Sequence, residues 1–148
     1  MSNIAIIGAG GRMGKALIEA ISVTEGVQLT AALERPDSSL IGVDAGELAG
    51  IGRNNIAVVG SLAAAAAFDV LIDFSIPAVT AANAKFCAEQ GTKMVIGTTG
   101  LNDEQLQHVK AARQNNALCM ASNYATGVNL VFKPAELWPL YTSPSPRD

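Results

Sequence analysis

A buried strand that runs into a glycine-rich turn and then into a helix is the feature that most limits the folds open to this chain. Ile4–Ile7 is a short apolar run. The glycines of the turn follow it at Gly8, Gly10, Gly11 and Gly14. Glycines let the backbone turn sharply and approach a ligand closely, while the next helix directs its free N–H groups and positive dipole end toward that ligand. The pattern predicts a dinucleotide-binding start, with the pyrophosphate at the turn.

The segment after the turn supports this interpretation, although Met13 replaces the third glycine of the common G-x-G-x-x-G spacing. Apolar residues recur at helical spacing from Met13 to Ile21, and a second apolar run, Val27–Leu33, stops at Glu34. A carboxylate about 20 residues after the glycine turn can accept hydrogen bonds from the adenosine ribose. Arg35 is either an ordinary exposed loop arginine or a partner for a ribose 2′-phosphate. Together Glu34 and Arg35 predict tolerance of both NADH and NADPH.

The composition predicts one compact domain rather than a disordered or fibrous chain. The chain has 148 residues, of which 49% are hydrophobic and 16% charged. A formal net charge of −3 with scattered cations provides no field for nucleic acid or anionic membranes. No apolar stretch approaches the roughly 20 residues that a membrane helix needs. We therefore expect a soluble, cytoplasmic protein.

Strand-like and helix-like segments alternate along the chain, which is typical of an α/β fold with a doubly wound parallel sheet, the Rossmann dinucleotide-binding architecture. We expect strands near residues 3–7, 27–33, 56–59, 69–73, 93–96 and 117–120. We expect helices near residues 12–23, 61–66, 77–90 and 102–115. Residues 37–55, rich in Gly, Ser and Asp, predict a long surface excursion instead of a standard crossover helix.

Polar residues follow three of the predicted strands. Asp73–Pro77 reads first as a plain strand–helix connector, with the proline at the first helical turn. In Gly97–Gly100, two threonine hydroxyls between glycines are equally compatible with a simple turn and with a ligand contact. Asn123 and Tyr124, after the last strand, would present an amide and an aromatic face beside a nicotinamide. Since carboxyl ends of parallel strands share one edge, we expect one contiguous crevice there.

Histidine and cysteine usage indicates no catalytic or metal centre. His108 shares a helix side with Glu104 and Ala111, so we expect a solvated surface residue. Cys87 and Cys119 lack metal-ligand spacing, and we expect two buried, reduced thiols.

The last residues differ in character from the rest. Four prolines after Lys133 forbid a continuing helix or a central strand, so residues 134–148 predict a tail without packed structure. Leu140–Asp148 also reads like a translated sequencing adaptor and is set apart from the fold argument.

Six motifs, in order and with family-like gaps, closely resemble the dihydrodipicolinate reductase family over about residues 1–133. They are Gly8–Gly14, Ala32–Arg35, Asp44–Glu47, Asp73–Ser75, Val95–Gly100, and Ser122–Tyr124 followed by Gly127–Asn129. The resemblance implies an NAD(P)H-dependent oxidoreductase that reduces 4-hydroxy-tetrahydrodipicolinate in the diaminopimelate route to lysine. It implies a pyrophosphate site at Gly8, Ala9, Gly10, Gly11, Arg12 and Met13, ribose and 2′-phosphate sites at Glu34 and Arg35, and a nicotinamide site at Gly97, Thr98, Thr99, Ala121, Ser122, Asn123 and Tyr124.

The resemblance also implies a missing half. Family members continue into a substrate-binding domain with a Glu-x-His-His motif, a downstream lysine and an Asp-Ala-Pro-Ser-Gly-Thr-Ala loop, and this domain builds a homotetramer. None of these motifs occurs in this sequence, and Ile76 replaces an often polar or basic family residue. We therefore expect a cofactor-binding fragment, residues 1–133, that carries no catalytic residue, turns over no substrate and forms no tetramer. The alternatives are a stand-alone NAD(H)-binding sensor and another Rossmann dehydrogenase.

Overall fold

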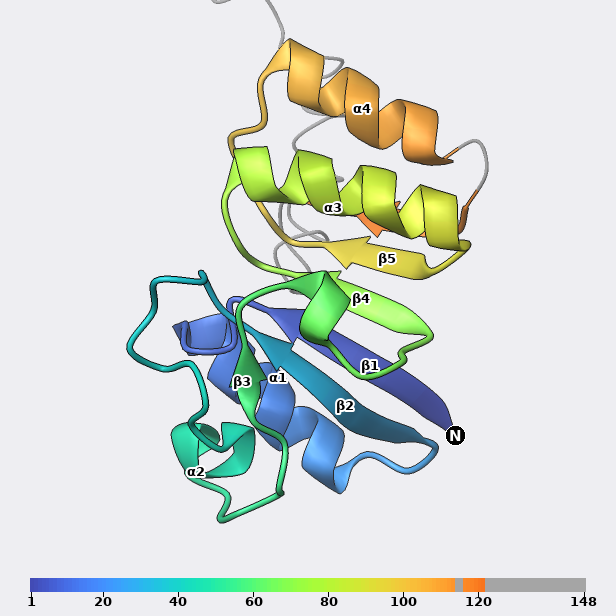
Figure 1. Cartoon of the computed structure of the whole chain (residues 1–148). Helices are drawn as coiled ribbons and strands as arrows, with labels where there is room; N and C mark the ends of the chain where they lie inside the picture. The colour runs from blue at the N-terminus through green and yellow to red at the C-terminus, as the bar shows by residue number, and fades with distance from the viewer. Residues whose placement is uncertain (114–115, 122–148) are drawn as a thin grey trace, which may run out of the picture.

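The computed structural model describes residues 1–113 and 116–121, and its strands form one parallel sheet (Figure 1). The strands are β1 (Ser2–Ile7), β2 (Val27–Leu33), β3 (Val58–Val59), β4 (Val70–Asp73), β5 (Lys93–Ile96) and β6 (Leu118–Met120). Their order across the sheet is β3-β2-β1-β4-β5-β6, and each described pairing is parallel. The chain starts in the middle and winds outward in two directions, which confirms the predicted doubly wound α/β fold.

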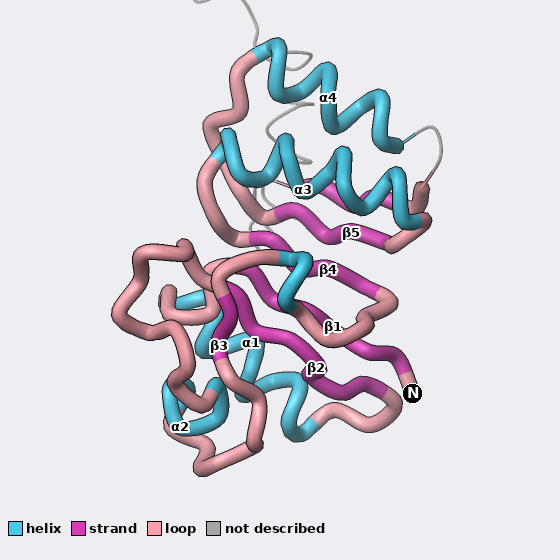
Figure 2. The backbone as a smooth tube through the Cα atoms, viewed as in Figure 1, coloured by secondary structure: helices cyan, strands magenta, loops and turns pink. Residues whose placement is uncertain are grey.

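Helices connect the strands, as Figure 2 shows in cyan. They are α1 (Arg12–Val23), α2 (Ala45–Ala49), the 3-10 helix η1 (Leu62–Ala64), α3 (Pro77–Gln90) and α4 (Asp103–Arg113). Local sequence explains the limits of α3, because Pro77 occupies the first turn and Gly91 ends the helix in the left-handed conformation, with φ of 66°. All six predicted strands and three of the four predicted helices match to within two residues at each end.

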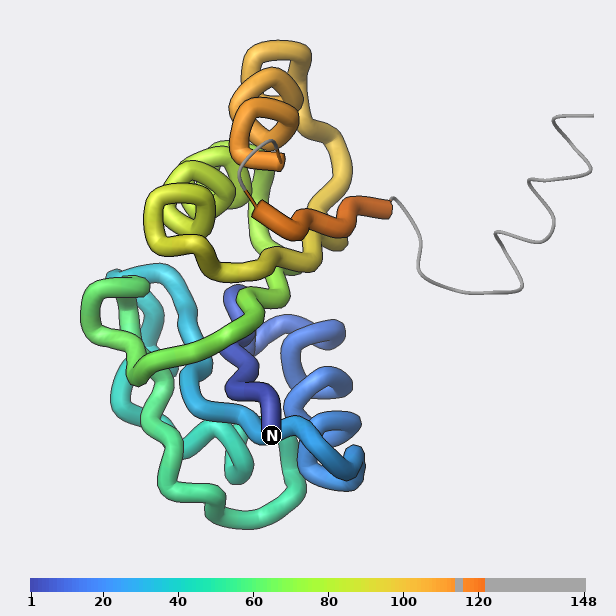
Figure 3. The backbone as a smooth tube through the Cα atoms, turned by 90° about the vertical axis from the view of Figure 1, so that its right-hand side faces the viewer, coloured from blue at the N-terminus to red at the C-terminus, as the bar shows by residue number. Residues whose placement is uncertain are grey.

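Both faces of the sheet are buried, so the core has two parts. Along β1, Ile4 and Ile6 face the cluster that includes Ile18 of α1, whereas Ala5 and Ile7 face the cluster that includes Cys87 of α3. Successive strand residues point to opposite faces, so a run of apolar residues is required where both faces are covered. In the turned view of Figure 3, α1 and α3 lie on opposite sides of β1.

The inner face of α1 packs on the sheet. Gly14 and Ile18 are buried, and Leu17 and Ile21 pack against the same cluster. The apolar spacing from Met13 to Ile21 correctly predicted a helix, but it does not coincide with the buried face. Met13 is 49% exposed, and Ala16 and Ala20 are exposed as well.

The connection between β2 and β3 is a long excursion, as predicted, but it includes the five-residue helix α2. One carboxylate organises it: Asp44 accepts hydrogen bonds from the backbone N–H groups of Gly46, Glu47, Asn54 and Asn55. Desolvation of Asp44 acts to raise its pKa, but these four bonds together hold the pKa below its usual value. A second difference follows in the alanine-rich segment, where the predicted helix at 61–66 is reduced to η1.

The two cysteines lie in different environments. Cys87 is buried in α3 and Cys119 is exposed on β6, and neither forms a disulfide. The prediction of two buried thiols was therefore wrong for Cys119, because among the described strands β6 pairs with β5 alone. Within the described part of the chain, no helix is long and apolar enough to span a bilayer. The predicted tail at 134–148 lies outside the described residues.

Candidate functional site

The glycine turn joins the end of β1 to α1. Gly8 adopts a left-handed conformation, with φ of 80°, and the N–H groups of Gly8 and Ala9 donate to the carbonyl of Leu33 at 3.0 and 3.1 Å. The N-cap of α1 is Gly11, and no side chain of the described residues caps this helix. Among the described residues, the first N–H groups of α1 therefore remain available for an anion.

Gly14 is required by close packing of the helix on the turn. A Cβ atom at this position would overlap the carbonyl oxygen of Gly8 and lie 2.7 Å from the Cα atom of Ala9. Both contacts are with backbone, which cannot move aside as a flexible side chain could. Gly14 thus brings the amino end of α1 directly against the turn.

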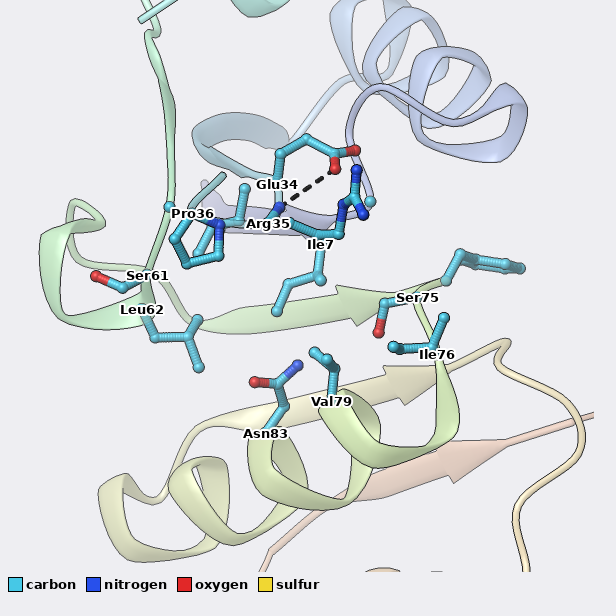
Figure 4. A pocket seen from close by; sticks show the side chains of 14 residues that line it. Ile7, Glu34, Arg35, Pro36, Ser61, Leu62, Ser75, Ile76, Val79 and Asn83 are labelled. Atoms are coloured by element: carbon cyan, nitrogen blue, oxygen red, sulfur yellow. Dashed lines mark hydrogen bonds between the residues drawn. The ribbon is translucent and has the colours of Figure 1, made fainter. Parts of the chain in front are cut away.

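Glu34, at the end of β2, is joined to the glycine turn. Its Oε1 atom accepts a hydrogen bond from the Gly10 N–H at 2.8 Å, and its Oε2 atom accepts from the Arg35 N–H at 3.3 Å. The second of these bonds is the dashed line in Figure 4. The backbone of Glu34 is itself held, since its N–H donates to the carbonyl of Val59 at 3.0 Å. The Glu34 carboxylate, which the sequence predicted as a site residue, therefore lies against the glycine turn.

Arg35 is the next residue, and its side chain is 73% exposed. Its Nε atom lies 3.8 Å from Oδ1 of Asp37, whose side chain is 78% exposed. This is the one ion pair within the described residues. Asp37 was not identified as a site residue from the sequence.

A pocket of about 330 Å³ opens between these residues and the β4–α3 connection. Figure 4 shows Ile7, Leu62 and Val79 converging on it from three elements, while Glu34 and Arg35 lie along one rim. The remaining lining residues are Gly8, Leu33, Pro36, Gly60, Ser61, Phe74, Ser75, Ile76 and Asn83. The pocket is largely apolar, of a size and character that suit a flat heterocyclic ring. Its apolar residues come from four separate segments, so no local pattern in the sequence marked it.

A buried polar cluster lies beside the pocket, at the carboxyl ends of β4 and β5. Asp73 is fully buried and accepts hydrogen bonds from the Ser75 N–H at 2.9 Å, the Ser75 hydroxyl at 2.5 Å and the Asn83 amide at 2.9 Å. The Thr98 hydroxyl lies 3.4 Å from Asp73 Oδ1, and the Thr80 hydroxyl donates to Thr98 at 2.8 Å. Every buried side-chain polar atom of the described residues has a partner. The Asp73–Pro77 segment is therefore more than a strand–helix connector.

This cluster holds part of the predicted nicotinamide site. Thr98 is 4% exposed and its hydroxyl faces Asp73 and Thr80, whereas Thr99 is exposed. Gly97 lies directly under the ring of Phe74, and any Cβ atom there would overlap that ring. Ala121 follows β6, and its N–H donates to the carbonyl of Ile96 at 3.3 Å. Ser122, Asn123 and Tyr124 lie outside the described residues.

Other candidate groups lie away from this edge. His108 is exposed on α4, as predicted, beside Lys85 and Glu89 of α3. Cys87 is buried beneath α3, and burial, with the nearby charge of Asp73, raises the pKa of its thiol to about 12. No group of His, Cys, Asp and Glu among the described residues could hold a metal ion. The signals that could have revealed the polar cluster were Thr80 and Asn83, two polar residues on the buried side of α3, which otherwise presents Ala84 and Cys87 there.

Comparison with known proteins identifies the same family that the sequence motifs resemble, over most of the chain. Residues 2–124 match the sequence model of the family described as dihydrodipicolinate reductase, N-terminus. A 4-hydroxy-tetrahydrodipicolinate reductase from Alkalilimnicola ehrlichii is 53% identical over 137 residues, which cover 92% of this chain and 51% of that protein. The chain thus spans about half the length of this curated relative.

Two solved structures share the fold. A dipicolinate-bound dihydrodipicolinate reductase from Paenisporosarcina sp. TG-14 superposes with a TM-score of 0.74 at 24% identity, covering 99% of this chain and 62% of that one. The WlbA dehydrogenase from Chromobacterium violaceum, in complex with NADH and UDP-GlcNAcA, has a TM-score of 0.67 at 18% identity and is covered to 40%, against 93% of this chain. At 24% and 18% sequence identity, these two superpositions show a shared fold.

Proposed function

This chain belongs to the dihydrodipicolinate reductase family, and we propose that it is the dinucleotide-binding part of a 4-hydroxy-tetrahydrodipicolinate reductase. The observation that carries the proposal is the hydrogen bond from Gly10 to Glu34 beside an apolar pocket. This arrangement joins an anion-binding turn, a ribose-binding carboxylate and a ring-sized pocket in one crevice. NADH or NADPH, when bound, would supply the hydride for the reduction.

The residues of the crevice suit the parts of a dinucleotide in order. The pyrophosphate would lie on the N–H groups of the turn from Gly8 to Met13. The adenosine ribose would donate its hydroxyls to Glu34, and the adenine ring would enter the pocket between Leu62 and Val79. Arg35 is exposed at the rim and would meet a 2′-phosphate.

The nicotinamide would lie toward the carboxyl ends of β5 and β6. We propose contacts from Gly97, Thr98 and Thr99 and from the segment Ala121–Tyr124. Because the Thr98 hydroxyl bonds inside the protein, a contact from this residue would come from its main chain. The role of this side chain would be to hold the loop after β5 at a set distance from the ring.

The complete reaction is a proposal for the whole protein. We propose reduction of 4-hydroxy-tetrahydrodipicolinate in lysine biosynthesis, in the cytoplasm and by a homotetramer, as the family resemblance implies. The described residues of the crevice include no histidine or lysine that could deliver a proton to a substrate. We therefore expect the 148-residue chain alone to bind the cofactor without turning over substrate.

Calorimetric titration of the full chain with NADH and NADPH tests the proposal. We expect saturable binding of both, with NADH affinity lowered about tenfold or more in Glu34→Ala, because a charge-assisted hydrogen bond is lost. Glu25→Gln is the matched control, since Glu25 lies at the opposite edge of the sheet, before β2. Absence of binding by a chain with a folded circular dichroism spectrum would contradict the proposal.

A further inference from the structure

We propose that Asp37 sets the cofactor preference of this site by weakening the attraction of Arg35 for the 2′-phosphate of NADPH. The inference rests on the proposed dinucleotide-binding function. The structural observation is the ion pair between the two exposed side chains at the pocket rim. It assigns a specificity role to a residue outside the glycine turn and outside the pocket lining.

A tight turn places Asp37 next to Arg35. The N–H of Ser38 donates to the carbonyl of Arg35 at 2.9 Å, which closes a four-residue turn with Pro36 at its second position. Pro36 packs closely on Gly60, where a Cβ atom would lie 3.0 Å from the Pro36 Cα atom. The turn is therefore fixed by its own hydrogen bond and by the contact of Pro36 with Gly60. This backbone geometry keeps the Asp37 carboxylate near the Arg35 guanidinium.

The contact competes with a phosphate for the same guanidinium. Arginine binds phosphate best through two parallel N–H donors, and one such pair consists of Nε and a terminal nitrogen. Oδ1 of Asp37 lies 3.8 Å from Nε, too far for a hydrogen bond, so the Asp37 charge attracts this side of the guanidinium without occupying its donor. Both side chains are exposed, so a ligand can reach the ion pair. The Asp37 carboxylate and the phosphate would therefore compete for Arg35 as solvated groups.

The local charge also opposes a phosphate. Arg35 is the one cationic residue among those that line the pocket, and Glu34 and Asp37 flank it with two carboxylates. A ribose phosphate carries a charge of about −2, so it meets a net negative rim. NADH lacks this phosphate, and its ribose needs only the Glu34 carboxylate. Asp37 should therefore discriminate between the two cofactors while leaving NADH binding unchanged.

The test is a titration of the full chain and its Asp37→Asn variant with NADPH and with NADH. We expect NADPH affinity to rise about two- to fivefold, the range for an exposed ion pair, and NADH affinity to stay the same. Measured against Arg35→Gln alone, Asp37→Asn should give a smaller NADPH gain, because only the direct repulsion between Asp37 and the phosphate then remains. The gain should also shrink in about 0.5 M salt because exposed charges are screened. Glu25→Gln, which removes the same charge at the far edge of the sheet, should change neither affinity.

The outcomes separate this inference from the proposed function. If NADH and NADPH both bind but Asp37→Asn leaves their affinity ratio unchanged, or shifts both affinities equally, the specificity role of Asp37 is overturned while the dinucleotide site stands. If the NADPH gain is as large in the Arg35→Gln background as in the unmodified chain, the proposed competition for Arg35 is wrong. If the folded chain binds neither nucleotide, the proposed function fails and the inference fails with it.

Discussion

The Oε1 atom of Glu34 accepts a hydrogen bond from the backbone N–H of Gly10 at 2.8 Å, although the two residues are 24 positions apart. The bond joins the carboxyl end of β2 to the turn after β1, two neighbouring strands of the parallel sheet. It orients the carboxylate before any ligand arrives. The ribose contact of the proposed site is therefore preorganised, with little side-chain entropy left to lose on binding.

Gly14→Ala should destabilise the fold, although alanine is the better helix former by about 1 kcal/mol. The new Cβ would overlap backbone atoms of Gly8 and Ala9, and such overpacking costs about 1–3 kcal/mol. Urea unfolding followed by circular dichroism measures the change. A stability equal to or above that of the unmodified chain would show that the helix and the turn can separate without loss.

Gly10→Ala is the matched comparison for this substitution. Its Cβ would meet the end of the Leu40 side chain, which can move, and would lie 3.1 Å from Oε1 of Glu34. We expect an unfolding midpoint close to that of the unmodified chain, together with weaker NADH binding, because the carboxylate is displaced. A loss of stability as large as that of Gly14→Ala would contradict the distinction between a side-chain and a backbone obstacle.

Asp73→Ala should destabilise the protein by about 3 kcal/mol, since it leaves the buried donors of Asn83 and Thr98 without their acceptor. Asp69→Ala, before the amino end of the same strand, is the control. Its carboxylate is exposed and accepts one hydrogen bond from the Asn3 N–H, so we expect a loss below about 1 kcal/mol. Chemical denaturation of both variants provides the comparison. Equal losses would mean that the buried cluster adds nothing beyond a surface contact.

The two thiols should differ in reactivity. Cys119 is exposed and should react rapidly with a thiol reagent at neutral pH, whereas buried Cys87 should react only after unfolding. Mass spectrometry should therefore find one label on the native chain, two in denaturant, and none on native Cys119→Ser. Rapid labelling of native Cys119→Ser would show that Cys87 is accessible.

The raised pKa of Cys87 also predicts a pH dependence. Its ordinary value is 9.0 and its folded value is about 12, so above pH 9 the unfolded thiol loses its proton before the folded thiol does. This contribution to stability is complete below pH 9 and declines as the pH rises toward 12. Denaturation midpoints of the chain and of Cys87→Ser, measured between these limits, should converge with rising pH. Parallel curves would contradict the assignment.

The order of strands and helices, the glycine turn and the position of Glu34 at the end of β2 could all be predicted from local sequence. These features depend on local regularities: a run of apolar residues for a strand buried on both faces, helical spacing after the turn, and glycine where φ is positive or helix and strand meet. The same regularities placed His108 on the solvent side of α4. They failed at Cys119, which was predicted to be buried but is exposed, because the burial of a strand residue depends on what packs against the strand.

Which polar groups contact one another depends on how the segments pack in three dimensions. Asp73, Asn83 and Thr98 come from three segments, and their hydrogen bonds exist because β4, β5 and α3 converge at one edge. The pocket between Leu62 and Val79 likewise depends on the packing of η1 and α3 on the same face of the sheet. Asp37 and Arg35 are close in sequence, yet their pairing depends on a turn seated against Gly60. Propensity and periodicity describe each segment alone, whereas these contacts depend on distances between segments that only the folded sheet sets.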